Sequence, residues 1–207
     1  PVEQLTFIAF TNVASLFAAG SIVMVDKARN FQSVPVSVFG ISLSVAIFSA
    51  LSRDAAIHNR ELFLHNLWKT ARQILIATVA SAVFFFFFGE AVIRILFGGG
   101  KFGVEQVALT GTLLSFFALA IPTESMIHLL ARAFYAMKDT VTPVLLSLIG
   151  LGLILLTVNF LKVPLGLKAI PLSFFIGSFI EVVLLFFILL RRLRNWDTPQ
   201  SSPASPS

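Results

Sequence analysis

The chain has 207 residues, of which 57% are hydrophobic and 12% are charged, and its mean hydropathy is +0.93. This composition is too apolar for an ordinary soluble domain. The 15 Lys and Arg residues outnumber the 10 Asp and Glu residues and gather at the ends of apolar segments, which indicates membrane topology and argues against a nucleic-acid partner. Because the sequence has no cysteine, disulfides and thiolate metal sites are excluded.

Several apolar runs reach the roughly 20 residues that cross a bilayer core. They are continuous rather than alternating, so we predict an all-α, polytopic transmembrane bundle with six spans. The chain opens with Pro1-Val2-Glu3, without a methionine or a charged leader. We therefore expect a piece of a larger protein, with no signal peptide visible.

The first predicted span covers residues 5–25 and includes Gly20. Its small polar residues fit helix packing, but Asn12 and Ser15 share a face and would also suit a hydrophilic cavity. A polar break is expected over 26–33. Pro35 then starts the second span, 36–51, which completes a helix hairpin over 1–51.

Residues 52–73 form the longest polar stretch before the tail and predict an amphipathic helix at the cytoplasmic interface, with Trp68 at headgroup depth. His58 and His65 are expected to be surface residues, because no metal-binding pattern surrounds them. The third span is expected over 74–95.

A glycine-rich turn containing Gly98 and Gly100 follows the third span. It lacks the Gly-Lys-Ser/Thr pattern of a phosphate-binding loop, so we interpret it as a turn between membrane segments.

Residues 105–138 contain no polar turn and would form a helix of about 50 Å, longer than the bilayer core of about 30 Å. We expect one span bent at Pro122, because two spans would reverse the distribution of basic residues across the membrane. With one span, the cytoplasmic face collects Arg53, Arg60, Lys69, Arg72, Arg132, Lys138, Arg191, Arg192 and Arg194.

Glu124, His128 and Arg132 follow one another at four-residue intervals within that span, with Tyr135 near the same face. Charged residues inside a membrane helix are costly and normally face a cavity or a partner. Two readings stay open. The three residues form a ladder that satisfies itself, or they line a cavity that contacts an anionic headgroup or moves protons.

The last two spans are predicted over 143–161 and 170–190, joined by a loop at 162–168, so that spans three to six occupy 74–194. Glu181 lies in the middle of the last span, where it either pairs with another helix or lines a cavity. Residues 195–207 are rich in proline and serine and are expected to be disordered.

The segment Arg-Ala-Phe-Tyr-Ala-x-x-Asp-Thr-x-Thr-Pro, from Arg132 through Asp139 to Pro143, resembles a signature of the MurJ/MviN family. These proteins are the bacterial lipid II flippases of the multidrug/oligosaccharidyl-lipid/polysaccharide (MOP) exporter superfamily. Further similarities in the family's order are Thr11-Asn12, Ala14-Ser15, Gly20-Ser21, Ala28, Pro35, Phe39-Gly40, Leu51-Ser52-Arg53 and the Leu-Phe-Gly-x-Gly-x-Phe loop at 96–102.

Some positions depart from the family pattern. Arg29 and Asn30 stand where the family has an acidic residue followed by an arginine, and Phe10 and Ser33 stand at positions that are often acidic. If the family's cavity arginine binds the pyrophosphate of the lipid, Arg29 replaces it only with a shift of one residue, or about 100° around a helix.

The resemblance implies the C-terminal six-helix half of a two-lobed transporter in the bacterial cytoplasmic (inner) membrane. Lipid II, the undecaprenyl-pyrophosphate-linked peptidoglycan precursor, would be flipped by alternating access around a cationic cavity. The expected partners are this anionic lipid, membrane lipids and the missing N-terminal half, with no cofactor and no metal. The expected cavity residues are Asn12, Arg29, Asn30, Glu124, His128 and Arg132.

The chain has no nucleophile, base and orienting residue in a recognisable set, so we do not expect an enzyme. Two alternatives to a lipid II flippase stay open. Another MOP exporter, moving other lipid-linked glycans or small cations, would fit the substituted cavity positions. A membrane scaffold that transports nothing is the other possibility.

Overall fold

The computed structural model describes residues 2–18, 20–98 and 103–194, and within these ranges it is helical and contains no strand. The elements are α1 (Val2–Ala14), α2 (Ser21–Pro35), the π-helical segment η1 (Val36–Ile41), α3 (Ser42–Ala56), α4 (Arg60–Phe97), α5 (Val104–Ala118), α6 (Ile121–Ala136), α7 (Val141–Leu165), the 3₁₀ segment η2 (Gly166–Lys168) and α8 (Ala169–Arg194).

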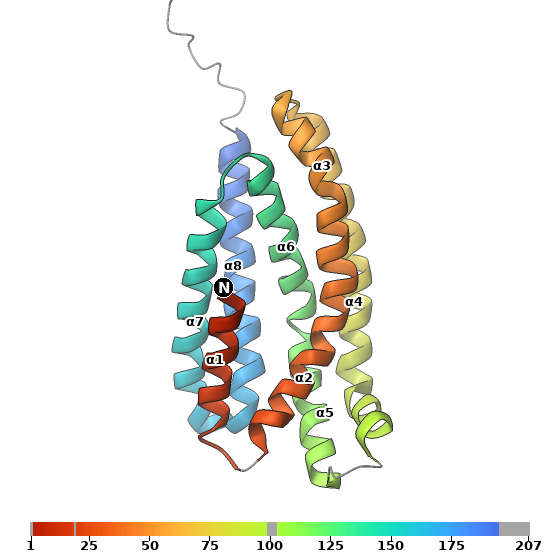
Figure 1. Cartoon of the computed structure of the whole chain (residues 1–207), viewed down its shortest axis with the longest axis vertical. Coiled ribbons are helices and arrows are strands. Elements are labelled where there is room, and N and C mark those ends of the chain that lie inside the picture. The colour runs from red at the N-terminus through yellow and green to blue at the C-terminus, as the bar shows by residue number, and fades with distance from the viewer. Residues whose placement is uncertain (1, 19, 99–102, 195–207) are drawn as a thin grey trace, which may run out of the picture.

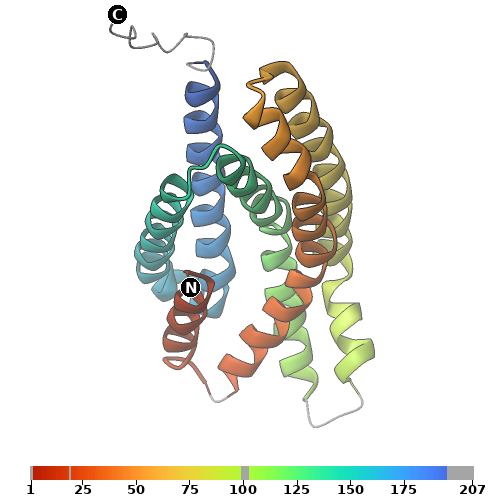
Figure 2. The same cartoon turned by 45° about the horizontal axis from the view of Figure 1, so that its top comes forward.

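The helices form two groups. α1, α7 and α8 lie together on one side, while α2, α3 and α4 lie on the other, with α5 and α6 between them (Figures 1 and 2). A cluster of three rings, Phe10, Phe117 and Phe174, ties α1, α5 and α8 together, with ring centroids 5.7–6.3 Å apart. This apolar cluster lies beside the polar site described below.

Three helical stretches are long and apolar enough to cross a membrane, judged by length and composition: Ser21–Ala56, Arg60–Phe97 and Val141–Arg194. The pair α5 and α6, bent by 43°, makes a fourth. The third stretch folds back at Gly166, whose φ of 55° suits glycine, so that α7 and α8 pack side by side. With the shorter apolar α1, the described residues make six helical passes, and the predicted all-α membrane bundle is confirmed.

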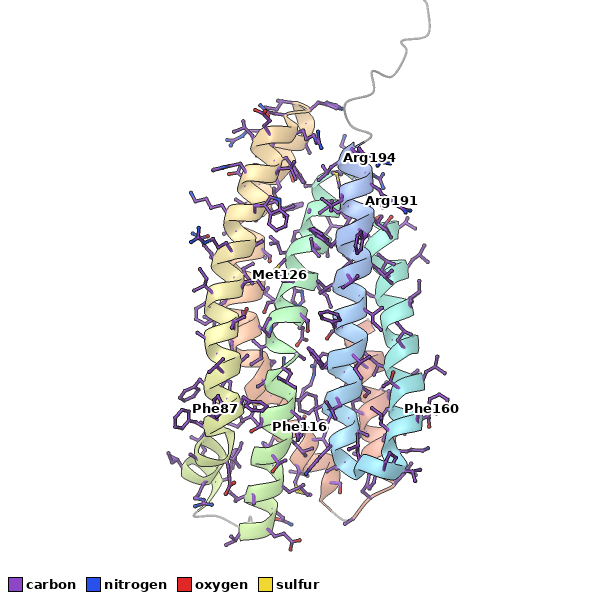
Figure 3. All side chains as sticks on the ribbon, turned by 180° about the vertical axis from the view of Figure 1, so that it is seen from behind. Phe87, Phe116, Met126, Phe160, Arg191 and Arg194 are labelled. Atoms are coloured by element: carbon purple, nitrogen blue, oxygen red, sulfur yellow. The ribbon has the colours of Figure 1, made fainter. Side chains whose placement is uncertain are left out.

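Basic residues lie at one end of the bundle. Figure 3 places Arg191 and Arg194 at the end of α8, and Figure 1 shows the α3–α4 and α6–α7 turns at that same end. We propose, from the positive-inside rule, that this end faces the cytoplasm. Phe87 and Phe160 are 72% and 79% exposed and project from the sides of the bundle, where lipid tails would contact them (Figure 3).

The expected polar break at 26–33 is wrong, because α2 runs through it without interruption. The chain turns earlier, between α1 and α2, and Gly20 adopts a φ of 92° there. The polar residues of α2 remain in a helix because Arg29 and Gln32 find partners inside the bundle rather than in water. The first pass therefore ends at Ala14, and α2 belongs to the second.

The expected separate amphipathic helix over 52–73 is also wrong. α3 continues to Ala56, and after a short turn α4 begins at Arg60 and runs without a break through the third span. The Asn59 side chain caps α4 by accepting a hydrogen bond from the Leu62 N–H at 3.0 Å. Phe63 and Leu67 are buried against other helices, whereas Leu62 and Trp68 are exposed, so only part of the apolar side of this segment packs on protein.

The segment expected as one bent helix over 105–138 consists of α5 and α6, which meet at Leu119 and Ala120. Pro122, the second residue of α6, has no N–H to bond to the preceding turn, which favours a break at this point. η1 packs directly on the start of α6: a Cβ on Gly40 would lie 2.7 Å from the Ser125 hydroxyl oxygen. The irregular parts of the two long passes therefore touch.

The remaining boundaries differ by a few residues. α7 continues through the expected loop to Leu165, and α8 extends to Arg194. Gly100 and the predicted disordered tail, 195–207, lie outside the described residues.

Candidate functional site

A polar cavity of about 370 Å³ lies inside the bundle, between α6 and the group formed by α1, α7 and α8. A few polar and charged side chains project into this cavity, and the rest of its wall is apolar. The lining residues are Thr6 of α1, Arg29 of α2, Glu124, Ile127, His128, Ala131 and Tyr135 of α6, Pro143, Val144, Ser147, Leu151 and Ile154 of α7, and Phe174, Ser178 and Glu181 of α8.

Arg29 contacts one residue of its own helix and one residue on each of two other helices. Its Nη2 donates a hydrogen bond to Glu124 Oε1 at 3.0 Å, and its Nη1 donates to Gln32 Oε1 at 3.2 Å, one turn along α2. The guanidinium carbon lies 4.1 Å from the centre of the Phe174 ring, a cation–π contact with α8. Hydrogen bonds therefore hold the guanidinium at its edge, and the Phe174 ring packs against its face.

Both carboxylate oxygens of Glu124 accept hydrogen bonds from α2. Its second oxygen, Oε2, accepts a hydrogen bond from Gln32 Nε2 at 2.7 Å, which closes a ring of three side chains with Arg29. Glu124 lies in the first turn of α6, where a carboxylate is stabilised by the helix dipole. The side chains of Arg29 and Glu124 are 19% and 12% exposed. This ion pair joins α2 to α6 within the membrane.

Glu181 is the second carboxylate of the cavity and is 7% exposed. Its Oε1 accepts a hydrogen bond from the Ser147 hydroxyl at 2.6 Å, across the α7–α8 contact. Its Oε2 lies against Gly150, where an added Cβ would come within 2.5 Å of that oxygen. Close by, the hydroxyls of Thr123 and Ser178 are hydrogen-bonded at 2.9 Å and link α6 to α8.

The charge balance of the cavity is not cationic in this part of the protein. Among the lining residues, Arg29 is the only lysine or arginine, whereas Glu124 and Glu181 are both acidic. Across the described ranges, no group of three or more His, Asp or Glu residues is arranged to hold a metal ion. A cationic cavity in the intact protein would need basic residues from outside this chain.

Three of the six residues expected in the cavity line it: Arg29, Glu124 and His128. The other three do not. Asn12 is exposed on α1, and Asn30 is exposed and donates to Asp26 Oδ2 at 3.2 Å on its own helix. The guanidinium of Arg132 lies 5.8 Å from the centre of the Phe48 ring, toward α3.

The ladder reading of α6 fails for a specific reason. Glu124 bonds to Arg29 and Gln32 of α2 rather than to the residue one turn further along its own helix. Sequence reasoning missed Gln32, Ser147 and Gly150. Gln32 stands three residues after Arg29, a helical spacing that would have indicated its role if residues 26–33 had been read as helix.

The motif residues of the α6–α7 turn have a structural explanation. Asp139 caps α7 by accepting hydrogen bonds from the N–H groups of Val141 and Thr142, at 3.2 and 3.1 Å, and from the Thr142 hydroxyl at 2.7 Å. Arg192, at the end of α8, donates to the same carboxylate. Pro143 follows within the first turn of α7, where its missing N–H costs little.

Burial raises the pKa of Asp139, but the hydrogen bonds from Thr142 and Val141 and the charge of Arg192 lower it by more. The net effect is a pKa below the ordinary value of an aspartate.

The remaining motif residues lie at turns and helix ends: Gly20 before α2, Pro35 before η1, Gly98 after α4 and Pro122 at the start of α6. Tyr135 lines the cavity.

In the described part of the chain, six helical passes surround a buried ion pair and a polar cavity, an arrangement that defines a multi-pass helical membrane protein. A family model described as "Lipid II flippase MurJ" matches residues 1–202. The chain belongs to this family, and it is a multi-pass protein of the bacterial inner membrane.

Individual relatives agree with the family assignment. The chain is 30% identical over 195 residues to the lipid II flippase MurJ of Burkholderia cenocepacia, a match that covers 92% of this chain and 37% of that protein. A solved structure, "Lipid II flippase MurJ, inward closed conformation", superposes with a TM-score of 0.83 at 23% identity. The superposition covers 94% of this chain and 42% of the chain in the solved structure, so the fold is shared. The chain therefore spans less than half the length of the proteins it matches.

Proposed function

We propose that the chain is the C-terminal lobe of a flippase that moves lipid II across the bacterial inner membrane by alternating access. The observation that carries this proposal is the membrane-buried pair of Arg29 and Glu124 in a polar cavity, within a chain that belongs to the lipid II flippase MurJ family. The remainder of the protein and the surrounding lipids are its expected partners.

Arg29 is suited to a phosphate group, because a guanidinium matches a phosphate with two parallel hydrogen bonds. In the present arrangement Glu124 and Gln32 occupy the two terminal nitrogens. A phosphate would therefore bind by replacing the Glu124 carboxylate, one anion for another. This exchange would release α6 from α2, so that substrate binding and helix movement become one event.

The size of the cavity limits what enters it. At about 370 Å³ it falls in the range of small-ligand pockets, roughly 300–1,000 Å³. It would admit the pyrophosphate of the lipid but not the attached peptidoglycan precursor, which would lie toward the other lobe. The process breaks and forms no covalent bond, so we propose a transporter and not an enzyme.

A second candidate is the export of a small cation by a related MOP-type mechanism. The excess of carboxylates over arginine among the lining residues favours it. The two candidates predict opposite effects of neutralising Glu124: phosphate binding would be eased by the loss of a competing anion, whereas cation binding would be lost.

The test uses the full-length gene in cells depleted of their own lipid II flippase, with growth and periplasm-accessible lipid II as readouts. We expect the wild-type gene and Arg94→Ala to restore both, and Arg29→Ala to restore neither. Arg94 is a matched control, because it also pairs with a glutamate, Glu90 of its own helix, but its side chain is 65% exposed and outside the cavity. Failure of the inserted wild-type protein to rescue would overturn the proposal.

A further inference from the structure

Glu181 lies halfway along α8, well inside the membrane span, and is 7% exposed. The residues that line its cavity include a single arginine, Arg29, and that arginine is bonded to Glu124 and Gln32. The group that donates a hydrogen bond to Glu181 is neutral, the Ser147 hydroxyl. A carboxylate without a cation inside a membrane is costly and is a functional-site candidate by default.

The groups that face Glu181 across the cavity do not offset its charge. α6 contributes Glu124, His128 and Tyr135, and α2 contributes Arg29. The lining residues of α1 and α7 include no titratable group. Glu124 adds a second negative charge to the same cavity, and Arg29 offsets only one of the two. Because Arg29 is bonded to Glu124, Glu181 is the carboxyl group of the cavity that is suited to hold a proton.

The surroundings of Glu181 are shaped to hold a carboxyl group. Gly150 lies where any larger residue would meet Glu181 Oε2, since an added Cβ would stand 2.5 Å from that oxygen. Ser147, one turn earlier on α7, supplies the hydrogen bond to the other oxygen. Because Glu181 also lines the cavity, a proton can reach it from cavity water.

We propose that Glu181 is a proton-binding site, and that the cavity carries its proton from one side of the membrane to the other during transport. The carboxylate takes a proton from water when the cavity is open to one face and releases it to water at the opposite face. An O–H bond forms on the carboxylate as one breaks in hydronium, the reverse occurs on release, and the transported lipid is chemically unchanged. This inference rests on the proposed function for the direction of coupling, but the proton site itself has an independent readout.

The direct test is infrared spectroscopy of the full-length protein at neutral pH. A protonated carboxyl group has a carbonyl stretch that is separate from that of a carboxylate and shifts in D₂O. We expect this band in the wild type and in Glu90→Gln, and its loss in Glu181→Gln. Glu90 is the matched control, because it also lies in a membrane helix but pairs with Arg94 at the surface. A band that survives Glu181→Gln, or is absent from the wild type, would overturn the assignment.

Ser147→Ala provides a second variant that keeps the carboxyl group and so avoids the risk that Glu181→Gln does not fold. Removing the hydrogen bond to the carboxyl oxygen is expected to move the same infrared band to higher frequency. An unchanged band in Ser147→Ala would contradict the assignment to Glu181.

Flipping of lipid II in proteoliposomes tests the coupling. An imposed pH gradient is expected to change the initial rate several-fold for the wild type and for Glu90→Gln, and to have no effect on Glu181→Gln. A response that persists in Glu181→Gln would refute proton coupling at this residue. If the wild type flips no lipid II under any gradient while the infrared band is present, the proposed function fails and the proton site stands.

Discussion

Arg29 and Glu124 are 95 positions apart in the sequence, and Nη2 of the first lies 3.0 Å from Oε1 of the second. Their contact fastens α2 to α6 next to two irregular segments, η1 and the α5–α6 break. Because Gly40 of η1 also packs against Ser125 of α6, the two broken passes are joined by an ion pair and by close contact. Movement at η1 would therefore displace the α5–α6 break, and the reverse.

Neutralising one member of this pair should destabilise the lobe, because the other member is left buried and charged. We expect Glu124→Gln to lower the free energy of unfolding of the full-length protein by about 2 kcal/mol, below the value for a fully enclosed pair. Thermal unfolding in detergent measures it. Glu90→Gln, which breaks an exposed pair, should change stability by less than about 1 kcal/mol. Equal effects of the two changes would contradict the importance of the buried pair.

Gly150 and Gly152 offer a matched comparison on α7. Gly150→Ala should push the Glu181 carboxyl group away from its place and cost about 1–3 kcal/mol of stability, because the added Cβ would lie 2.5 Å from Oε2. A Cβ added to Gly152 would meet no atom within 4 Å, so Gly152→Ala should be neutral or stabilise the helix by up to about 1 kcal/mol. Thermal unfolding of both variants checks the prediction, which fails if Gly150→Ala is tolerated as well as Gly152→Ala.

Arg132 should contribute to packing rather than to transport. Its contact with the Phe48 ring joins α6 to α3, and it does not line the cavity. We expect Arg132→Ala to lower stability by about 0.5–1 kcal/mol and to retain rescue of growth, in contrast to Arg29→Ala. His65→Ala, on the exposed side of α4, should retain both stability and rescue. Loss of rescue by a stably inserted Arg132→Ala would show that this arginine has a role that the cavity does not explain.

The α6–α7 turn should depend on pH through Asp139. Because the pKa of Asp139 is lowered in the folded state, its ionised form stabilises the turn at pH values above the ordinary value of 3.8. That stabilisation should be lost as the pH falls through the lowered folded-state value. Asp139→Ala should cost about 0.5–2 kcal/mol at neutral pH, from the loss of the cap, and progressively less in acid.

Hydrogen exchange at the amides of Val141 and Thr142, compared between wild type and Asp139→Ala from neutral to acidic pH, measures this effect. The two proteins should converge at low pH. A difference that stays constant with pH would mean that the charge of Asp139 does not contribute.

The number of passes and the existence of a polar stripe on α6 could be predicted from the sequence, because both follow from local hydropathy. The ends of the helices could not. Arg29 and Gln32 look like a polar loop in the sequence, and only their long-range partner Glu124 shows why a helix can bury them. The turn lies instead between α1 and α2, where Gly20 adopts a left-handed backbone directly before α2 begins.

The residues of the site could be predicted only where their local sequence marks them. Glu124 and His128 stand out in the sequence because acidic and basic residues inside a span are rare. Of the two readings that the sequence left open for α6, the ladder within the helix is wrong, because Glu124 bonds to Arg29 and Gln32 of α2. A pairing across 95 positions is a property of the tertiary fold and leaves no local signal in one sequence.

The length of α4 has a practical consequence. Its 38 residues rise about 57 Å, nearly twice the thickness of a bilayer core of about 30 Å. Figure 1 shows the α3–α4 turn extending beyond the α6–α7 turn at the basic end of the bundle. An epitope inserted at this turn would be carried on a rigid helical hairpin outside the membrane. An antibody fragment bound there would mark the orientation of the lobe in electron microscopy images and leave the cavity untouched.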